Sequence, residues 1–135
     1  MTNTTSKVFE LGGARIWLDE SQIVRLVYFP GTMVTLKEAK EGGAAIIELC
    51  DGKKRPIYVD SRGVKNIDRE ARLFSVSEAS ATPWIKAMAV LTSPVTRVLG
   101  ELFNRINKPP YPIRLFTSEE ESLSWLREQM KSDEP

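Results

Sequence analysis

A chain of 135 residues is long enough to bury an ordinary core as one domain, so it requires no stabilisation by a disulfide or a metal. Its net charge of +1, from 19 basic and 18 acidic residues, produces no overall field that would attract nucleic acid or an anionic membrane. Histidine is absent and Cys50 is the single cysteine, which excludes histidine-dependent triads and zinc sites built from histidine and cysteine.

The N-terminal sequence MTNTTSKVFELGG lacks the basic and then apolar regions of a signal peptide, and no apolar run approaches the roughly 20 residues that span a bilayer. Cys50 lies in the apolar run AAIIELC, where a thiol is typical of a core, and a lone cysteine fits a reducing compartment. We therefore expect a cytoplasmic protein without a membrane span, and we assign it no metal and no cofactor.

The first part of the chain predicts an antiparallel meander. Residues 1–6 are polar and are expected to form a disordered tail. The segments VFEL and ARIWL then flank Gly12-Gly13, which predicts a hairpin because glycine tolerates the positive φ that tight hairpin turns require. The segment IVRLVYF, rich in β-branched and aromatic residues, supplies a third strand.

A helix is predicted next, from about Leu36 to Cys50. Thr35 stands three residues before Glu38, which is the spacing of a capping box, and apolar residues follow at helical intervals. Gly42-Gly43 lies inside this helix and costs it about 1 kcal/mol per glycine relative to alanine. The pair indicates either a close contact between helix and sheet or a kink, and Asp51-Gly52 ends the helix.

Strands and helices alternate in the rest of the chain. PIYVD is a short strand, Asp68 begins a helix that runs to about Ala79, and WIKAMAVLT is typical of a strand buried on both faces. Ser93-Pro94 begins a third helix, and the three prolines in residues 107–112 predict irregular structure. IRLF is the last strand, and Ser118 with Glu121 has capping-box spacing before a fourth helix.

These elements predict an α/β fold in which a meander is followed by alternating strands and helices. One mixed sheet covered by about four helices is the consistent arrangement. We expect a single domain over residues 7–131, with residues 132–135 as a C-terminal tail.

The central segment resembles the STAS domain, the fold of the bacterial anti-sigma factor antagonists. The resemblance lies in the order of elements and in Val59-Asp60, Gly63-Val64 and Ile67-Asp68, where a strand ending in aspartate leads through a Gly-Val turn to Ile-Asp. The C-terminal LFTSEEESLSWL is similar to an uncharacterised bacterial branch described as STAS-like or Sec14-like. The resemblance implies a SpoIIAA-like fold and a regulatory role.

The chain departs from the phosphoregulated members at the start of the second helix. In those members, serines that follow the helix-capping aspartate include the one that a partner kinase phosphorylates. Here Asp68 is followed by Arg69, Glu70 and Ala71, so Glu70 occupies the position of the acceptor serine. We therefore expect no switching by phosphorylation at this position.

Two interpretations of these charges are compatible with each other. In the first, Asp68 caps the helix and Glu70 complements its positive end, which together are worth about 1 to 2 kcal/mol. In the second, a charged ridge binds a partner, and Glu70 imperfectly imitates a phosphorylated state because a carboxylate carries less charge than a phosphate. The ridge consists of Asp60, Arg62, Asp68, Arg69 and Glu70.

Other polar groups near this segment have simpler roles. Ser61, Ser75 and Ser77 have no base at a recognisable spacing, and a turn serine usually bonds locally, so we assign no nucleophile. The cations of KKR, residues 53–55, are typical of a solvated turn rather than a phosphate site.

The first functional hypothesis is a non-enzymatic regulatory module that binds another protein through the charged ridge. The alternative is a small-molecule binder of Sec14-like type, taking an apolar or anionic ligand such as a lipid or a nucleotide. That function places a pocket against Trp84 to Leu91 and Pro94 to Phe103, with head-group contacts from Arg97, Arg105 and Lys108.

An enzyme is the third hypothesis, based on the carboxylate pair Asp60 and Asp68, and no glycine-rich phosphate loop of a known type supports it. A homodimer is compatible with the sequence.

Overall fold

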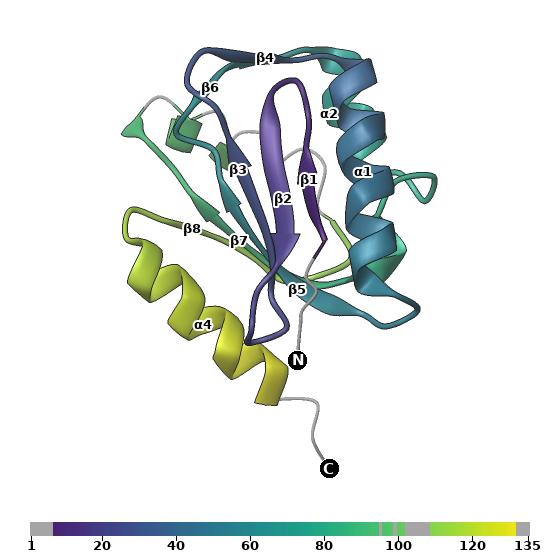
Figure 1. Cartoon of the computed structure of the whole chain (residues 1–135). Helices are drawn as coiled ribbons and strands as arrows, with labels where there is room; N and C mark the ends of the chain where they lie inside the picture. Colours follow the sequence, from purple (N-terminus) through teal and green to yellow (C-terminus); the bar gives the residue numbers. More distant parts are fainter. Residues whose placement is uncertain (1–6, 95, 99, 102–108, 132–135) are drawn as a thin grey trace.

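The computed structural model describes residues 7–94, 96–98, 100–101 and 109–131 (Figure 1). A six-stranded mixed sheet forms its centre, in the order β1-β2-β3-β5-β7-β8. The strands are β1 (Val8–Glu10), β2 (Ala14–Leu18), β3 (Val24–Tyr28), β5 (Arg55–Asp60), β7 (Ile85–Leu91) and β8 (Ile113–Phe116). The predicted tails, residues 1–6 and 132–135, lie outside the described residues.

The predicted meander is confirmed, because β1 pairs antiparallel with β2 and β2 antiparallel with β3. From β3 onward the pairings with β5, β7 and β8 are all parallel. The reason given for the glycine turn was wrong, since Gly12 and Gly13 do not adopt a positive φ. Crowding explains Gly13 instead, because a Cβ added there would lie 2.7 Å from Cγ2 of Thr32.

Helices lie against both faces of the sheet (Figure 1). The helix α1 (Leu36–Cys50) packs on the face that includes Ile57 and Val59, and α4 (Glu119–Lys131) packs on the face that includes Tyr58. Shorter helical segments are α2 (Arg69–Ser75), the 3-10 turn η1 (Thr82–Trp84) and residues 94, 96–98 and 100–101. The mixed α/β architecture predicted from the sequence is confirmed.

The start and end of α1 follow the prediction. Thr35 and Glu38 form the reciprocal capping box, and Asp51 adopts a left-handed conformation with φ 50° just after the helix. The helix continues through Gly42-Gly43, where added Cβ atoms would make only ordinary contacts, 3.9 Å from Ile16 and 3.6 Å from Phe74. No close approach therefore requires glycine at either position, and the helix is unbroken across the pair.

Two short strands were not predicted. β4 (Thr32–Val34) and β6 (Val64–Ile67) pair in parallel as a separate two-stranded sheet. Each joins a strand of the main sheet to a helix, because β4 precedes α1 and β6 precedes α2. The predicted turn between Asp60 and Asp68 is therefore partly an extended strand.

One element prediction, the end of the second helix, needs correction. The second helix ends at Ser75 rather than near Ala79, because the hydroxyls of Ser77 and Ser80 bond to the carbonyls of Phe74 and Ser75 and replace helical bonds.

In β7, buried residues alternate with half-buried ones. Ala87, Ala89 and Leu91 belong to the core under α4, while the half-buried Met88 and Val90 pack against the core under α1. Both faces of β7 are therefore covered, as predicted, although less completely on the α1 side.

Candidate functional site at the carboxyl end of the sheet

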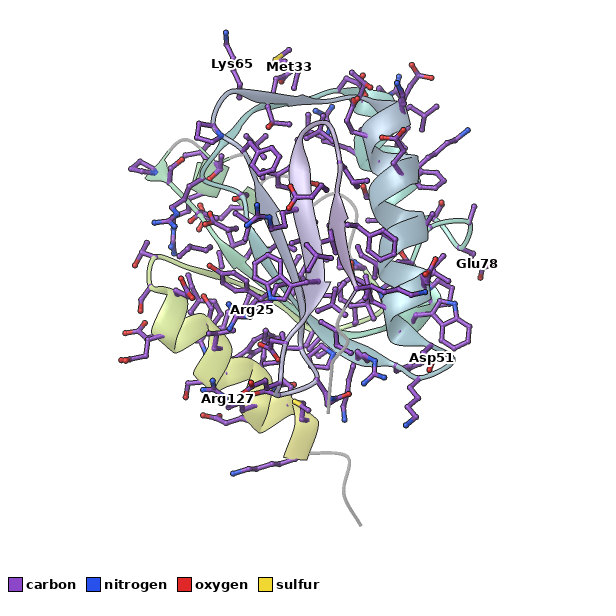
Figure 2. All side chains as sticks on the ribbon, in the orientation of Figure 1. Arg25, Met33, Asp51, Lys65, Glu78 and Arg127 are labelled. Atoms are coloured by element: carbon purple, nitrogen blue, oxygen red, sulfur yellow. The ribbon has the colours of Figure 1, made fainter. Side chains whose placement is uncertain are left out.

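The turns that follow β3 and β5 meet at one end of the molecule, where β4 and β6 lie across them (Figure 1). We call residues 29–34 and 60–67 the strand-end surface. Met33 and Lys65 project from it side by side (Figure 2), and both are exposed. In open α/β sheets, ligands and partners usually bind beyond the carboxyl ends of the strands.

Asp60 and Arg62 form the charged centre of the strand-end surface. The buried Asp60 carboxylate accepts hydrogen bonds from Arg62 Nε at 3.0 Å, Nη2 at 2.8 Å and the backbone N at 3.1 Å. These bonds raise the pKa of the Arg62 guanidinium above its ordinary value. The Arg62 side chain is still 57% exposed, so a fixed cation faces solvent.

Gly63 holds the two turns together through its backbone. Its carbonyl accepts hydrogen bonds from Gly31 N at 2.8 Å and from Thr32 N at 3.1 Å. A Cβ at Gly63 would lie 2.6 Å from the carbonyl oxygens of both Tyr28 and Phe29, closer than any side chain permits. This turn therefore requires glycine.

Thr32 joins a third turn to the other two. Its hydroxyl lies 2.6 Å from the carbonyl oxygen of Phe29 and 3.0 Å from that of Gly13, in the β1–β2 turn. Phe29 N also donates a hydrogen bond to Gly13 O at 3.0 Å. Backbone groups and one hydroxyl thus fix the shape of this end of the domain.

The second half of the predicted ridge lies at the start of α2. Asp68 caps this helix as predicted, since its Oδ1 accepts a hydrogen bond from Ala71 N at 2.9 Å. Arg69 and Glu70 are exposed beside it. The four residues of β6 separate this group from Asp60 and Arg62 by roughly 13 Å, so the structure divides the ridge into two groups.

The serines near the ridge are engaged in internal hydrogen bonds. The buried Ser61 Oγ donates to Leu91 O at 2.9 Å and lies 3.3 Å from Thr96 Oγ1. Ser75 and Ser77 donate to the carbonyls of residues 71 and 74. Ser61 thus connects the turn after β5 to the end of β7 and to the helical segment that follows β7.

The KKR turn lies at the opposite end of β5. Arg55 Nε donates to the carbonyls of Leu49 and Cys50 at 3.1 and 3.2 Å, and its Nη1 donates to Gln22 Oε1 at 2.8 Å. Arg55 therefore caps the C-terminal end of α1, while Lys53 and Lys54 are exposed. Cys50 is buried, which raises the pKa of its thiol.

Sequence reasoning missed Arg25 of β3, which joins the turn before this strand to the start of α4. Its Nε lies 2.8 Å from Asp19 Oδ2, its Nη1 lies 3.5 Å from Glu119 Oε2, and its Cζ lies 5.2 Å from the ring centroid of Tyr58. Burial is the main cause that raises the pKa of Tyr58 to about 12. The one signal in the sequence was a cation inside the apolar strand IVRLVYF.

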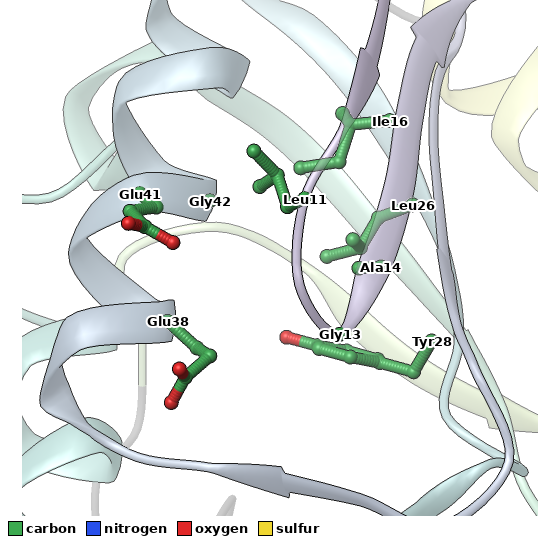
Figure 3. Close-up of a pocket in the computed structure, with 9 residues that line it drawn as sticks. All are labelled: Leu11, Gly13, Ala14, Ile16, Leu26, Tyr28, Glu38, Glu41 and Gly42. Atoms are coloured by element: carbon green, nitrogen blue, oxygen red, sulfur yellow. The ribbon is translucent and has the colours of Figure 1, made fainter.

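Two openings adjoin the strand-end surface, and sequence reasoning anticipated neither. The first, which we call the hollow, is a surface depression of about 380 Å³ lined by turns 12–13 and 29–33 and by Glu38. The second, the crevice, lies between α1 and the β1–β2 hairpin (Figure 3) and has about 10 Å³ of space, room for one water molecule. Trp84 to Leu91 and Pro94 to Phe103, predicted to line a pocket, line neither opening, and part of the second segment, with Arg105 and Lys108, lies outside the described residues.

Residues 16–130 match the model of a family described as Domain of unknown function (DUF7793). The chain belongs to this family. It is also similar to the crystal structure of an uncharacterised protein of the DUF3478 family with a SpoIIAA-like fold, from Shewanella loihica PV-4. That likeness has a TM-score of 0.64 and 14% identity, and it covers 87% of this chain and 97% of that one.

A protein of unknown function from Arthrobacter sp. FB24 is 30% identical over 89% of this chain and 96% of that one, with a TM-score of 0.35. No curated protein matches the chain.

The predicted SpoIIAA-like fold is thus confirmed for this DUF7793 protein. Across the residues that the structure describes, no helix has the length and apolar character needed to cross a membrane. In the same residues, no three acidic or cysteine side chains gather where they could hold a metal ion.

Proposed function

We propose that this DUF7793 protein is a non-enzymatic regulatory module that binds another protein through the strand-end surface. The observation that supports the proposal is the Arg62 guanidinium, exposed to solvent but held by the buried Asp60. A preorganised charge loses little side-chain entropy on binding, so its contact with a partner retains more of its free energy.

The surroundings of Arg62 suit a protein interface. Met33 is 51% exposed, and Lys65 projects beside it (Figure 2), so an apolar side chain and cations share one surface. Methionine adapts to irregular partner surfaces, and exposed cations steer encounter with acidic groups. The exposed Arg69 and Glu70 at the start of α2 would extend the interface along β6.

A second candidate function is the binding of a small molecule. The hollow, at about 380 Å³, is within the range of small-ligand sites, about 300–1,000 Å³. Its location differs from the predicted one, because it lies at the turns of the strand-end surface.

One experiment separates the two candidates. Tagged protein is purified from its native cells, and mass spectrometry identifies the proteins and small molecules that copurify. We expect a partner protein to copurify with the wild type and with Lys54→Glu, a control at the opposite end of β5, and to be lost with Arg62→Glu. The double variant Arg69→Glu, Glu70→Arg then tests whether the interface extends to α2.

Two outcomes would contradict the proposal. The first is a partner retained at wild-type levels by Arg62→Glu, which would place its binding elsewhere. The second is a stoichiometric small molecule with no enriched protein, which would favour the second candidate. Circular dichroism of each purified variant checks that it is folded.

A further inference from the structure

The face of the sheet that carries α4 is covered over one half only. α4 packs mainly on β5, β7 and β8, and among the described residues the helix that packs on β2 is α1, which lies on the opposite face (Figure 1). In the meander, the side chains that alternate with those of the core under α1 point to the α4 face. We call this uncovered part the open face, and its residues are Val8, Glu10, Arg15, Trp17, Arg25 and Val27.

The centre of the open face is apolar and within reach of solvent. Trp17 and Val27 are half-buried, and Val8, directly opposite Trp17 in the sheet, is 51% exposed. Trp17 and Val27 are diagonal neighbours, because Trp17 pairs with Arg25 and Val27 lies two residues beyond Arg25 on β3. Tryptophan and arginine are enriched at protein interfaces, so this composition is typical of a docking surface.

Arg62 lies at the border of the open face. Asp60 is the strand partner of Val27, and alternation along β5 places the Asp60 side chain on the same face as that of Tyr58, under α4. The Arg62 guanidinium, bonded to Asp60, is therefore close to Val27. Besides the hydrogen bonds to Asp60, the charge of Glu119 at the start of α4 raises the pKa of Arg62, which agrees with a position on this face.

The guanidinium of Arg62 keeps one hydrogen-bonding edge free. Asp60 accepts hydrogen bonds from Nε and Nη2, which form the side edge of the group. The end edge, formed by Nη1 and the second N–H of Nη2, has no partner among the described residues. Two parallel N–H groups of this kind match the two oxygens of a carboxylate.

A second exposed arginine lies on the other side of Val27. Arg15 is the strand partner of Val27 on β2, and its side chain is 53% exposed. Its Nε donates to Glu10 Oε2 at 2.6 Å, and its two Nη atoms have no partner in the described part of the chain. The open face thus presents unfilled N–H donors on both sides of an apolar centre.

We propose that the open face is the docking surface for a segment of the partner protein that carries a carboxylate beside apolar side chains. The inference rests on the proposed function, and it extends the interface from Arg62 over the meander. The carboxylate accepts two hydrogen bonds from the end edge of Arg62, while the apolar side chains cover Trp17 and Val27. A second acidic group of the segment can reach Arg15, whose Cα lies roughly 10 Å from that of Asp60, two strand spacings away.

Charge complementarity selects this occupant. A neutral or basic segment would bury the end edge of Arg62 without an acceptor, which costs free energy. A second copy of the chain would bring to the contact the carboxylates of Glu10 and Asp60, which its own arginines already bind.

The test uses the full chain, labelled with ¹⁵N, and a blocked leucyl-glutamyl-leucine peptide. We expect saturable NMR shifts at the amides of Trp17 and Val27. Glutamine in place of the glutamate should weaken binding at least about tenfold, because a neutral amide cannot form a charge-assisted pair with arginine. Equal affinity for the two peptides would overturn the proposal. Shifts confined to Gly31, Met33 and Lys65 would support the strand-end surface and overturn its extension over the meander.

Variants locate the site. Arg62→Lys keeps the charge but loses the paired N–H groups, so it should weaken the glutamyl peptide at least about threefold. Arg127→Lys, at an exposed position of α4 (Figure 2), is the matched control and should leave the affinity unchanged. Trp17→Ser should weaken the peptide by a similar factor to Arg62→Lys, and Val27→Thr, which keeps the β-branched shape and the fold, by at least about twofold. Unchanged affinity in Arg62→Lys or in Val27→Thr would overturn the assignment.

Two further arms test the other occupants. A phosphoseryl peptide that binds more than about tenfold more tightly than the glutamyl peptide would overturn the carboxylate in favour of a phosphorylated partner, because a phosphate carries more charge. A dimer in analytical ultracentrifugation that is lost in Val27→Thr would assign the open face to a second copy and overturn the proposal.

The copurification experiment separates this inference from the proposed function. Loss of the partner protein in both Arg62→Glu and Trp17→Ser, each folded by circular dichroism, is the expected result. Loss in Arg62→Glu with full retention in Trp17→Ser would refute the extension over the meander and support the proposed function. Full retention in both variants would refute both.

Discussion

The two ends of β5 use arginine in different ways. At the first residue of the strand, Arg55 turns back onto α1 and donates three hydrogen bonds to groups of the protein. Two residues beyond the strand, Arg62 is also bonded, but its side chain is 57% exposed. At the Arg62 end, Gly63 and Thr32 join the turns through backbone carbonyls. Backbone groups supply the rigidity there, which leaves the side chains available to a partner.

The largest expected change in stability tests whether backbone contacts fix the turn after β5, where Arg62 lies. Gly63→Ala should lower the free energy of unfolding by about 3 kcal/mol, because its Cβ would lie 2.6 Å from the carbonyl oxygens of Tyr28, the last residue of β3, and Phe29, which accepts hydrogen bonds from Thr32. Urea denaturation followed by circular dichroism measures the change.

Gly12→Ala is the matched control, since an added Cβ there has no atom within 4 Å. We expect it to change the free energy of unfolding by no more than about 0.5 kcal/mol. If Gly63→Ala were as stable as this control, the turn would not depend on the crowded backbone, and the comparison of the two ends would fail.

Smaller losses of stability are expected when each of the two arginines is replaced by methionine. Arg55→Met should lower the free energy of unfolding by about 1–2 kcal/mol, because the Leu49 carbonyl loses the donor from Arg55 and the Cys50 carbonyl keeps only the one from Lys53 N. Arg62→Met should cost at most about 1 kcal/mol, since the pair with Asp60 is exposed on the arginine side and Asp60 keeps its bond from the backbone N.

The stability costs of the two arginine substitutions should also differ in how they depend on ionic strength. The cost of Arg62→Met should decrease at high ionic strength, because solvent screens the exposed ion pair, while the cost of Arg55→Met should change little. A larger loss in Arg62→Met than in Arg55→Met would show that the strand-end arginine is mainly structural.

Much of the fold could be predicted because its signals are local. The capping box of Thr35 and Glu38 and the cap at Asp68 involve residues three positions apart, and the structure contains both. β4 and β6 were missed because each is very short and pairs with the other across a long stretch of chain. In β6 the adjacent polar residues Lys65 and Asn66 also break the alternation of apolar and polar residues that indicates a strand.

The candidate site was predictable in part. Asp60 and Arg62 are two residues apart, and the structure shows their contact. Their separation from Arg69 and Glu70 depends on β6, which the sequence pattern did not reveal. The hollow and the crevice combine the hairpin, the turn after β3 and α1, so only the tertiary arrangement brings their walls together.

The strand pairings fall into two groups according to how far apart the paired residues lie in the sequence. Residue pairs of the meander, such as Ala14 with Tyr28, are close in sequence, whereas β3 meets β5 at Val24 and Ile57 after the chain has passed through α1. Closing a short loop costs less entropy and takes less time, so we expect the meander to form early during folding and the parallel pairings later. Substitutions in β2 should therefore slow refolding in stopped-flow experiments, whereas substitutions in β8 should mainly accelerate unfolding.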